Sequence, residues 1–119
     1  MPTVKNKYNA KKVIGHDGKM FDSKKEAKYA ATLEMLKKSS DSATKVCTVE
    51  RQVVYELIPA QRDAAGKSIE RACTYKLDFR VTYADGHVEY VDVKGMKTEV
   101  YRIKKKLMLH VHGIRIKEV

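Results

Sequence analysis

Residues 75–83 alternate between apolar and polar side chains, a pattern that predicts a strand with one buried face. The apolar positions are Tyr75, Leu77, Phe79, Val81 and Tyr83. Residues 88–93 predict a second strand. The segment 84–86, which connects the two strands, ends in Gly86. The pattern therefore predicts a β-hairpin in the middle of the chain.

Helical patterns flank this hairpin. Residues 23–38 predict a helix, because Ser23 is a typical N-cap and good helix formers fill the interior. A second helix is expected from a Thr98 cap to about residue 111, with Gly113 as its stop.

Shorter patterns complete the fold. Residues 10–21 predict a small hairpin that turns at residues 16–18, and residues 39–44 and 59–67 predict polar loops. Residues 50–58 and 114–119 predict strands. The order is helix, three strands, helix, strand, so the 119 residues predict one α+β domain with a mixed sheet flanked by helices.

The length of the central turn decides which side chains face each other. A two-residue turn would set Asp78 opposite Val93 and send the two acids to opposite faces. A three-residue loop with Gly86 in the left-handed conformation sets Asp78 opposite Asp92 instead. The second register gives the cleaner apolar face, and we therefore prefer it.

In this register the two carboxylates lie roughly 5 Å apart, which is unfavourable unless a cation lies between them. A divalent metal would resolve the conflict, because Mg²⁺ takes oxygen ligands and one or two protein carboxylates suffice. The alternative is a surface hairpin whose acids are neutralised by Lys76, Arg80 and Lys94. The hairpin alone leaves both interpretations open.

Two more residues are candidates for the same site. Glu26 fits a capping box with Ser23, yet it also lies on the helix stripe expected to face the sheet, where a carboxylate needs a partner. Lys94 follows Asp92 by two residues, so both side chains leave one strand face. A lysine there can orient the attacking water or neutralise charge on a phosphate.

The second helix is expected to bury one face and present a basic one. The predicted buried face is Val100, Ile103, Leu107 and Val111. The predicted exposed face is Arg102, Lys105 and Lys106, with Lys104 reaching toward the site. His110 and His112 diverge across the helix end and are rejected as zinc ligands.

The formal charge of +10 makes a polyanion the leading partner, although a solvated lysine surface is the alternative. Cys47 and Cys73 are isolated, which favours a reduced, cytoplasmic protein. No apolar stretch approaches membrane-spanning length, so no membrane partner is expected.

These residues and their order resemble the PD-(D/E)XK nuclease superfamily, whose core has the order αβββαβ. A narrower resemblance is to a family of small phage Holliday-junction-resolvase-like endonucleases. The segments that carry it are Tyr8-Asn9-Ala10-Lys11-Lys12, Phe21-Asp22-Ser23-Lys24-Lys25-Glu26-Ala27, Leu77-Asp78-Phe79 and Asp92-Val93-Lys94-Gly95. The chain departs from the motif in having Leu77 in place of proline and Asp92 in place of glutamate.

The resemblance implies phosphodiester hydrolysis with Mg²⁺, for which Mn²⁺ would substitute. Asp78 and Asp92 would be metal ligands, Glu26 a further ligand directly or through water, and Lys94 would activate the attacking water. Gln52 is a weaker candidate for contacting the site. The aspartate in place of glutamate, being shorter, would shift the metal or its preferred ion.

We therefore expect a metal-dependent DNA endonuclease that cuts branched DNA as a homodimer, in the host cytoplasm if it is phage-encoded. The alternatives are a non-catalytic DNA-binding protein on the same fold, or a nuclease specific for flap, single-stranded or duplex DNA. The residues expected to contact DNA are Lys11, Lys12, Lys24, Lys25, Lys76, Arg102, Lys104, Lys105 and Lys106.

Overall fold

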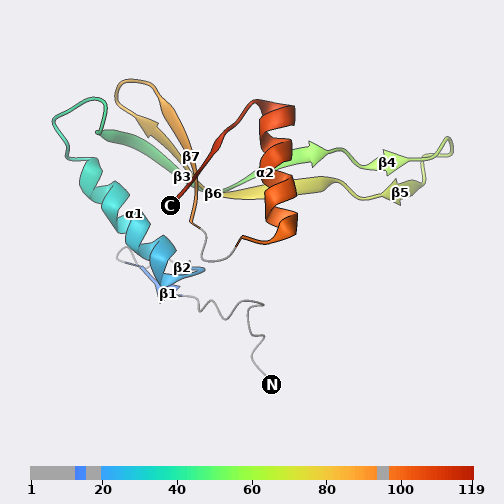
Figure 1. The fold of residues 1–119 in the computed structure, drawn as a ribbon, viewed down its shortest axis with the longest axis horizontal. Helices are drawn as coiled ribbons and strands as arrows, with labels where there is room; N and C mark the ends of the chain where they lie inside the picture. Colours follow the sequence, from blue (N-terminus) through green and yellow to red (C-terminus); the bar gives the residue numbers. More distant parts are fainter. Residues whose placement is uncertain (1–12, 16–19, 94–96) are drawn as a thin grey trace, which may run out of the picture. The chain divides into compact units, whose positions relative to one another are not determined.

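The computed structural model describes residues 13–15, 20–93 and 97–119. Its elements are, in chain order, β1 (Val13–Ile14), β2 (Met20–Phe21), α1 (Lys24–Leu36), β3 (Val46–Ile58), β4 (Gln61–Arg62), β5 (Ser68–Glu70), β6 (Cys73–Tyr83), β7 (Val88–Asp92), α2 (Glu99–His112) and β8 (Ile116–Glu118) (Figure 1). Four of these strands form one mixed sheet in the order β3-β6-β7-β8. The α+β class and the αβββαβ order of the larger elements are confirmed.

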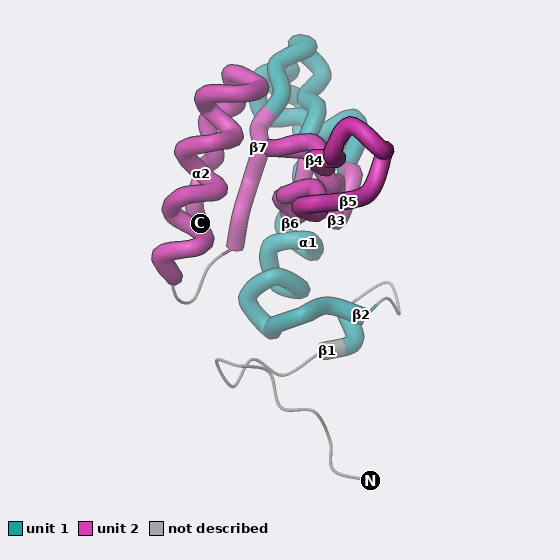
Figure 2. Tube along the Cα trace, turned by 90° about the vertical axis from the view of Figure 1, so that its right-hand side faces the viewer, with its two compact units in different colours: residues 1–49, 81–88 teal, residues 50–80, 89–119 magenta. Residues whose placement is uncertain are grey.

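The chain divides into two compact units, each made of two separate segments (Figure 2). The first unit comprises residues 1–49 and 81–88, and the second comprises residues 50–80 and 89–119. Strands β3, β6 and β7 each run from one unit into the other. Neither helix in the described chain is long and apolar enough to cross a membrane.

In the first unit, α1 contacts a small antiparallel hairpin of β1 and β2. The hairpin is confirmed, while its predicted turn lies outside the described residues. Phe21 is almost fully buried and its ring approaches Gly15 so closely that a β-carbon there would overlap it. α1 begins as predicted, since the Ser23 hydroxyl accepts a hydrogen bond from the Glu26 amide at 3.1 Å.

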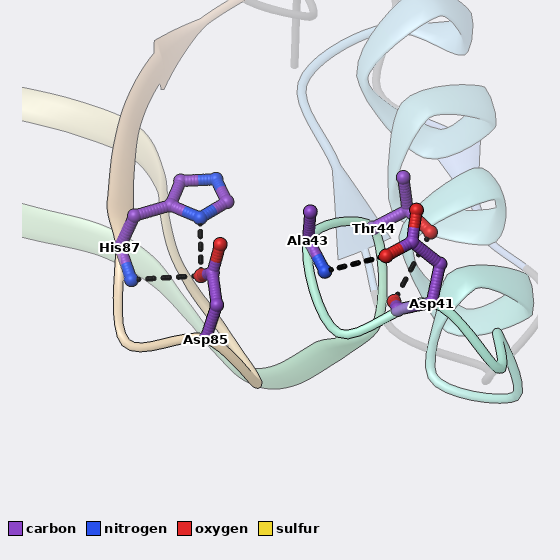
Figure 3. Close-up of polar contacts among 5 residues, drawn as sticks. All are labelled: Asp41, Ala43, Thr44, Asp85 and His87. Carbon is purple, nitrogen blue, oxygen red and sulfur yellow. Dashed lines mark hydrogen bonds and ion pairs between the residues drawn. The ribbon is translucent and has the colours of Figure 1, made fainter.

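In two turns of the first unit, an aspartate carboxylate accepts hydrogen bonds from residues of its own turn (Figure 3). In one, the Asp41 carboxylate accepts a hydrogen bond from the Ala43 amide at 3.0 Å. In the other, the Asp85 carboxylate accepts the His87 amide at 3.0 Å and also contacts the His87 ring. The Ala84 amide then donates to the Lys45 carbonyl at 2.8 Å, joining the two turns.

The central turn has the three-residue loop that we preferred. Gly86 has a φ of 94° and its amide donates to the Tyr83 carbonyl at 2.9 Å. The Tyr83 amide donates in turn to the His87 carbonyl at 2.9 Å. These bonds are those of a type I turn followed by a left-handed glycine, so the predicted bulged loop is confirmed.

The second unit has its own apolar core, where α2 packs against strands. The buried members are Leu57, Tyr75, Leu77, Tyr101, Met108 and Ile116. β8 pairs with β7 in parallel and sets Glu118 beside Asp92. α2 is capped as predicted, by Thr98 at its start and by the left-handed Gly113 at its end.

The predicted buried face of α2 is wrong. Val100, Ile103 and Val111 are 62%, 58% and 46% exposed, whereas Tyr101 and Met108 are buried. The inward stripe therefore lies about a quarter of a turn away from the one with the most aliphatic residues. Tyr101 and Met108 fill the space in the core. The spacing of apolar residues by itself does not predict that these two side chains point inward.

β3 is longer than predicted and contains an irregularity. It begins at Val46 rather than at residue 50, and Gln52 within it has a φ of 54°. Glu50 and Tyr55, five positions apart, would face opposite sides of a regular strand, yet both contact Arg80 at 2.9 and 2.8 Å. The left-handed backbone at Gln52 explains how both reach one guanidinium.

The segment 59–67, predicted as a loop, is part of a two-stranded arm. β4 and β5 pair there in antiparallel fashion, and every residue from 58 to 72 is exposed. The last strand also begins two residues later than predicted, at Ile116, where the chain enters the core.

Replacing Gly86 by valine is expected to lower the free energy of unfolding by about 1–2 kcal/mol, the cost of a left-handed β-branched residue. A β-carbon at Gly86 would meet no atom within 4 Å, so this cost is conformational rather than steric. Urea unfolding measures it. Gly86→Asn is the control and should lose less, because asparagine tolerates this conformation; equal losses would contradict the account.

The Glu50–Arg80 pair predicts a pH dependence of stability. The hydrogen bond from Arg80 lowers the pKa of Glu50 below its ordinary value of 4.5. Ionised Glu50 therefore stabilises the fold at pH values above the ordinary pKa of a glutamate. This contribution is lost as the pH falls through the lowered pKa of Glu50. Thermal melts of Glu50→Gln should show a deficit at neutral pH that vanishes in acid. Glu70→Gln, an exposed acid on β5, is the control; a deficit independent of pH would refute the prediction.

Candidate active site

Asp92 is the last residue of β7 and is completely buried, with 0% of its surface exposed. The hydroxyl of Tyr75, on the neighbouring strand β6, donates a hydrogen bond to Asp92 Oδ2. A buried carboxylate is tolerated only where donors replace the lost water, and Tyr75 is such a donor.

Asp78 lies at the same end of the hairpin. It is 9% exposed, and its Oδ2 accepts a hydrogen bond from the amide of Val93 at 2.8 Å. Val93 directly follows Asp92, at the point where β7 ends. The fold thus brings two buried carboxylates from adjacent strands to the end of one strand.

The predicted apolar face is buried throughout, at Leu77, Phe79, Val81, Val91 and Val93. The contact between Tyr75 and one of the two acids was not predicted. Counted without interruption from the Tyr83–His87 pair, Asp78 lies opposite Asp92 and Tyr75 points to the other face. The Tyr75 hydroxyl nevertheless reaches Asp92, the last residue of β7. Lys76 is exposed although Asp78, two residues on, is buried.

The hydroxyls of two tyrosines, Tyr75 and Tyr101, respond to the charges of both acids. Burial, and then the hydrogen bond to Asp92, raises the pKa of Tyr75 far above its ordinary value. Burial, and then a hydrogen bond to Glu118, likewise raises the pKa of Tyr101. The charges of Asp78 and Asp92 both add to each shift, so the two carboxylates lie within electrostatic range of the same hydroxyls.

Glu118 extends this polar group onto β8. Its carboxylate accepts a hydrogen bond from the Tyr101 hydroxyl at 2.7 Å and pairs with Lys105 at 3.1 Å and Lys97 at 3.3 Å. The Tyr101 bond, followed by the two lysines, lowers the pKa of Glu118 to about 2. Asp92 and Glu118 are partners in the β7–β8 ladder, and the Tyr75 and Tyr101 rings are 6.4 Å apart.

A family model described as "Protein of unknown function (DUF1064)" matches residues 5–117. The chain belongs to the DUF1064 family. No curated protein and no solved structure matches it.

In this DUF1064 chain, the other predicted site residues lie in different places, and one of them is outside the described residues. Glu26 is 3% exposed and belongs to the first unit, whereas Asp78 and Asp92 belong to the second, so its place in the site stays a prediction. Lys94 lies outside the described residues. Gln52 lies on β3, as predicted. Across the described ranges, no group of three or more His, Cys, Asp or Glu side chains has a geometry suited to a metal.

The predicted DNA-contacting residues of the DUF1064 chain also differ in exposure. Lys11 and Lys12 lie outside the described residues. Those that are exposed are Lys24, Lys25, Lys76, Arg102 and Lys106. Lys104 is half-buried. Lys105, predicted to be exposed, is instead half-buried and paired with Glu118, because it lies beside the inward stripe of α2.

Sequence reasoning missed the two tyrosines and Glu118 in this DUF1064 site. Tyr75 had been assigned to the apolar face as an ordinary core residue. The signal was present, since a buried tyrosine in place of phenylalanine needs a partner for its hydroxyl. Which acid supplies that partner depends on the register, and the sequence leaves it open.

Replacing Tyr75 by phenylalanine is expected to lower the free energy of unfolding by about 1–3 kcal/mol, because a buried carboxylate loses a donor. Denaturant unfolding at neutral pH measures the loss. Tyr90→Phe is the matched control, since Tyr90 packs against the same core and its hydroxyl has no hydrogen bond within the described chain. Equal stability changes in the two variants would contradict the assigned role of Tyr75.

Proposed function

We propose that this DUF1064 protein is a DNA endonuclease that uses Mg²⁺, or Mn²⁺ in its place, to hydrolyse phosphodiester bonds in branched DNA. The observation that supports the proposal is the pair of buried acids, Asp78 and Asp92, held together where β7 ends. Two like charges in a buried place are costly, and a structural role alone does not explain why both are acidic.

The donor set fits a hard divalent cation. Both acids supply carboxylate oxygens, the ligand type that Mg²⁺ prefers, and Mg²⁺ often takes only one or two protein carboxylates together with waters. When bound, the cation supplies charge stabilisation at the phosphate and a more acidic water. Two carboxylates therefore suffice, with Glu26 as a further ligand in the proposal.

Residues of the chain itself would orient the two carboxylates and the attacking water. The Tyr75 hydroxyl and the Val93 amide each hold one carboxylate oxygen, which fixes both side chains before a ligand arrives. The raised pKa of Tyr75 keeps its hydroxyl protonated as a donor. Lys94, two residues after Asp92, would orient the attacking water or neutralise charge on the phosphate.

Charge supports DNA as the substrate. The protein carries a formal charge of +10, and Arg102 and Lys106 on α2 are exposed and belong to the same unit as the two acids. Cationic side chains near the acids would offset the repulsion between carboxylates and the DNA backbone. A branched substrate and paired cuts would require two active sites, so the proposal includes a homodimer.

Asp78→Asn and Asp92→Asn are each expected to reduce Mg²⁺-dependent cleavage of a four-way junction more than about a hundredfold, since changing even outer-shell partners of a metal costs about 10–100-fold. DNA affinity should be unchanged or higher, because repulsion of phosphate is removed. Cleavage gels and fluorescence anisotropy measure the two properties separately.

Asp22→Asn is the control, because it removes the same charge from an exposed position of the first unit. A panel of junction, flap, single-stranded and duplex substrates identifies the preferred DNA form. DNA binding by the wild type without metal-dependent cleavage of any of these forms would refute the enzyme and favour a non-catalytic DNA-binding protein.

A further inference from the structure

A cavity of about 470 Å³ lies in the second unit, between α2 and the β8 segment. Its cationic lining is Lys97, Arg102, Lys105, Lys106 and Arg115. Among the described side chains that line it, Glu118 is the one carboxylate. Such an excess of positive charge around a concave surface favours an anionic ligand.

Glu118 divides these cations into two groups. Lys97 and Lys105 are paired with it, and its carboxylate is held by Tyr101 as well. The side chains of Arg102, Lys106 and Arg115 have no ion pair or hydrogen bond within the part of the chain that the structure describes. Three cations around the cavity are therefore available to a ligand.

The rest of the lining is aliphatic. Leu109 is 51% exposed, Ile114 is half-buried and Ile116 is 5% exposed, so the cavity has an apolar wall that reaches down to the core. A wall of this kind contributes binding energy only if the ligand brings a flat or apolar group with it. Inorganic phosphate alone would leave it uncovered.

The cavity adjoins the proposed active site. Glu118 on β8 is the ladder partner of Asp92 on β7, and adjacent strands lie about 5 Å apart. A DNA strand bound at the two acids would therefore pass close to the cavity.

We propose that this cavity binds one unpaired nucleotide of a single-stranded DNA segment next to the cleavage site. Its phosphate lies against Arg102, Lys106 and Arg115, and its base lies on the wall formed by Leu109, Ile114 and Ile116. A base within a duplex has its faces covered by its neighbours, so only an unpaired base can use the wall. The choice of DNA as the ligand rests on the proposed function, and the inference makes unpaired nucleotides at a branch the feature that is recognised.

The test measures binding of a labelled short oligothymidylate, an abasic oligomer of the same length and a hairpin duplex, by anisotropy in EDTA. Arg115→Gln should weaken binding of the oligothymidylate about fivefold to tenfold, the loss of one charge-assisted contact. Arg71→Gln removes the same charge from an exposed position before β6 and should change the affinity less than about twofold. Equal effects of the two variants would overturn the site.

A second pair of variants tests the apolar wall. Leu109→Asn should weaken binding of the oligothymidylate about threefold to tenfold while leaving the abasic oligomer and the duplex unchanged, because only the base meets this wall. Ile103→Asn, on the exposed part of α2, is the control and should have no effect. An equal loss for the abasic oligomer would overturn the assignment of the base.

Two further outcomes separate this inference from the proposed function. Free thymidine monophosphate should bind far more weakly than the oligomer, and equal affinity would assign the cavity to a free nucleotide and overturn the DNA segment. Because EDTA prevents metal-dependent cleavage, the binding pattern is independent of catalysis. Cavity-dependent binding without Mg²⁺-dependent cleavage would defeat the nuclease alone, and cleavage without cavity-dependent binding would defeat this inference alone.

Discussion

The burial of Asp92 is the constraint on which the rest of this structure depends. A carboxylate with no exposed surface needs hydrogen-bond donors, and the hydroxyl of Tyr75 supplies one from the adjacent strand. Asp78 is buried as well, and it accepts a hydrogen bond from the amide of Val93, the residue that follows Asp92 where β7 ends. A pair of acids confined in this way has little freedom to move apart, so a cation between them would meet ligands that are already oriented.

A second tyrosine, Tyr101, continues the polar contacts that surround Asp92. Tyr101 comes from α2, its ring is 6.4 Å from that of Tyr75, and its hydroxyl holds Glu118 on β8. Helix, hairpin and last strand are thereby joined by polar contacts as well as by the apolar core. The cationic cavity adjoins these contacts, because Glu118 both accepts the hydrogen bond from the Tyr101 hydroxyl and lines the cavity. The proposed chemistry and the proposed recognition of DNA thus depend on neighbouring strands of one unit.

Local signals in the sequence predicted much of the fold. The caps at Ser23 and Thr98 and the glycine stop at Gly113 depend on the residues beside them, and all three are confirmed. The bulged turn at Gly86 could also be predicted, because the three-residue loop gives a cleaner apolar face on the hairpin than the two-residue turn. Asp78 and Asp92 could be picked out for the same reason, from their places in that hairpin.

Tertiary packing decides the features that the sequence did not reveal. The inward face of α2 is set by Tyr101 and Met108, which fit the space above the sheet, and the more regular aliphatic stripe remains exposed. The hydrogen bond between Tyr75 and Asp92 joins neighbouring strands at a place that no residue pattern marks. The arm formed by β4 and β5 is wholly exposed, so its sequence has no alternation of apolar and polar residues that would predict strands.

The central claim is that Asp78 and Asp92 together hold one divalent cation. Anomalous diffraction from crystals of the protein grown with Mn²⁺ tests it directly, because the manganese signal locates the ion without reference to activity. The account predicts one strong peak within coordination distance of an oxygen from each of the two aspartates. Full-occupancy manganese elsewhere, with both carboxylates bound only by protein donors, would contradict it.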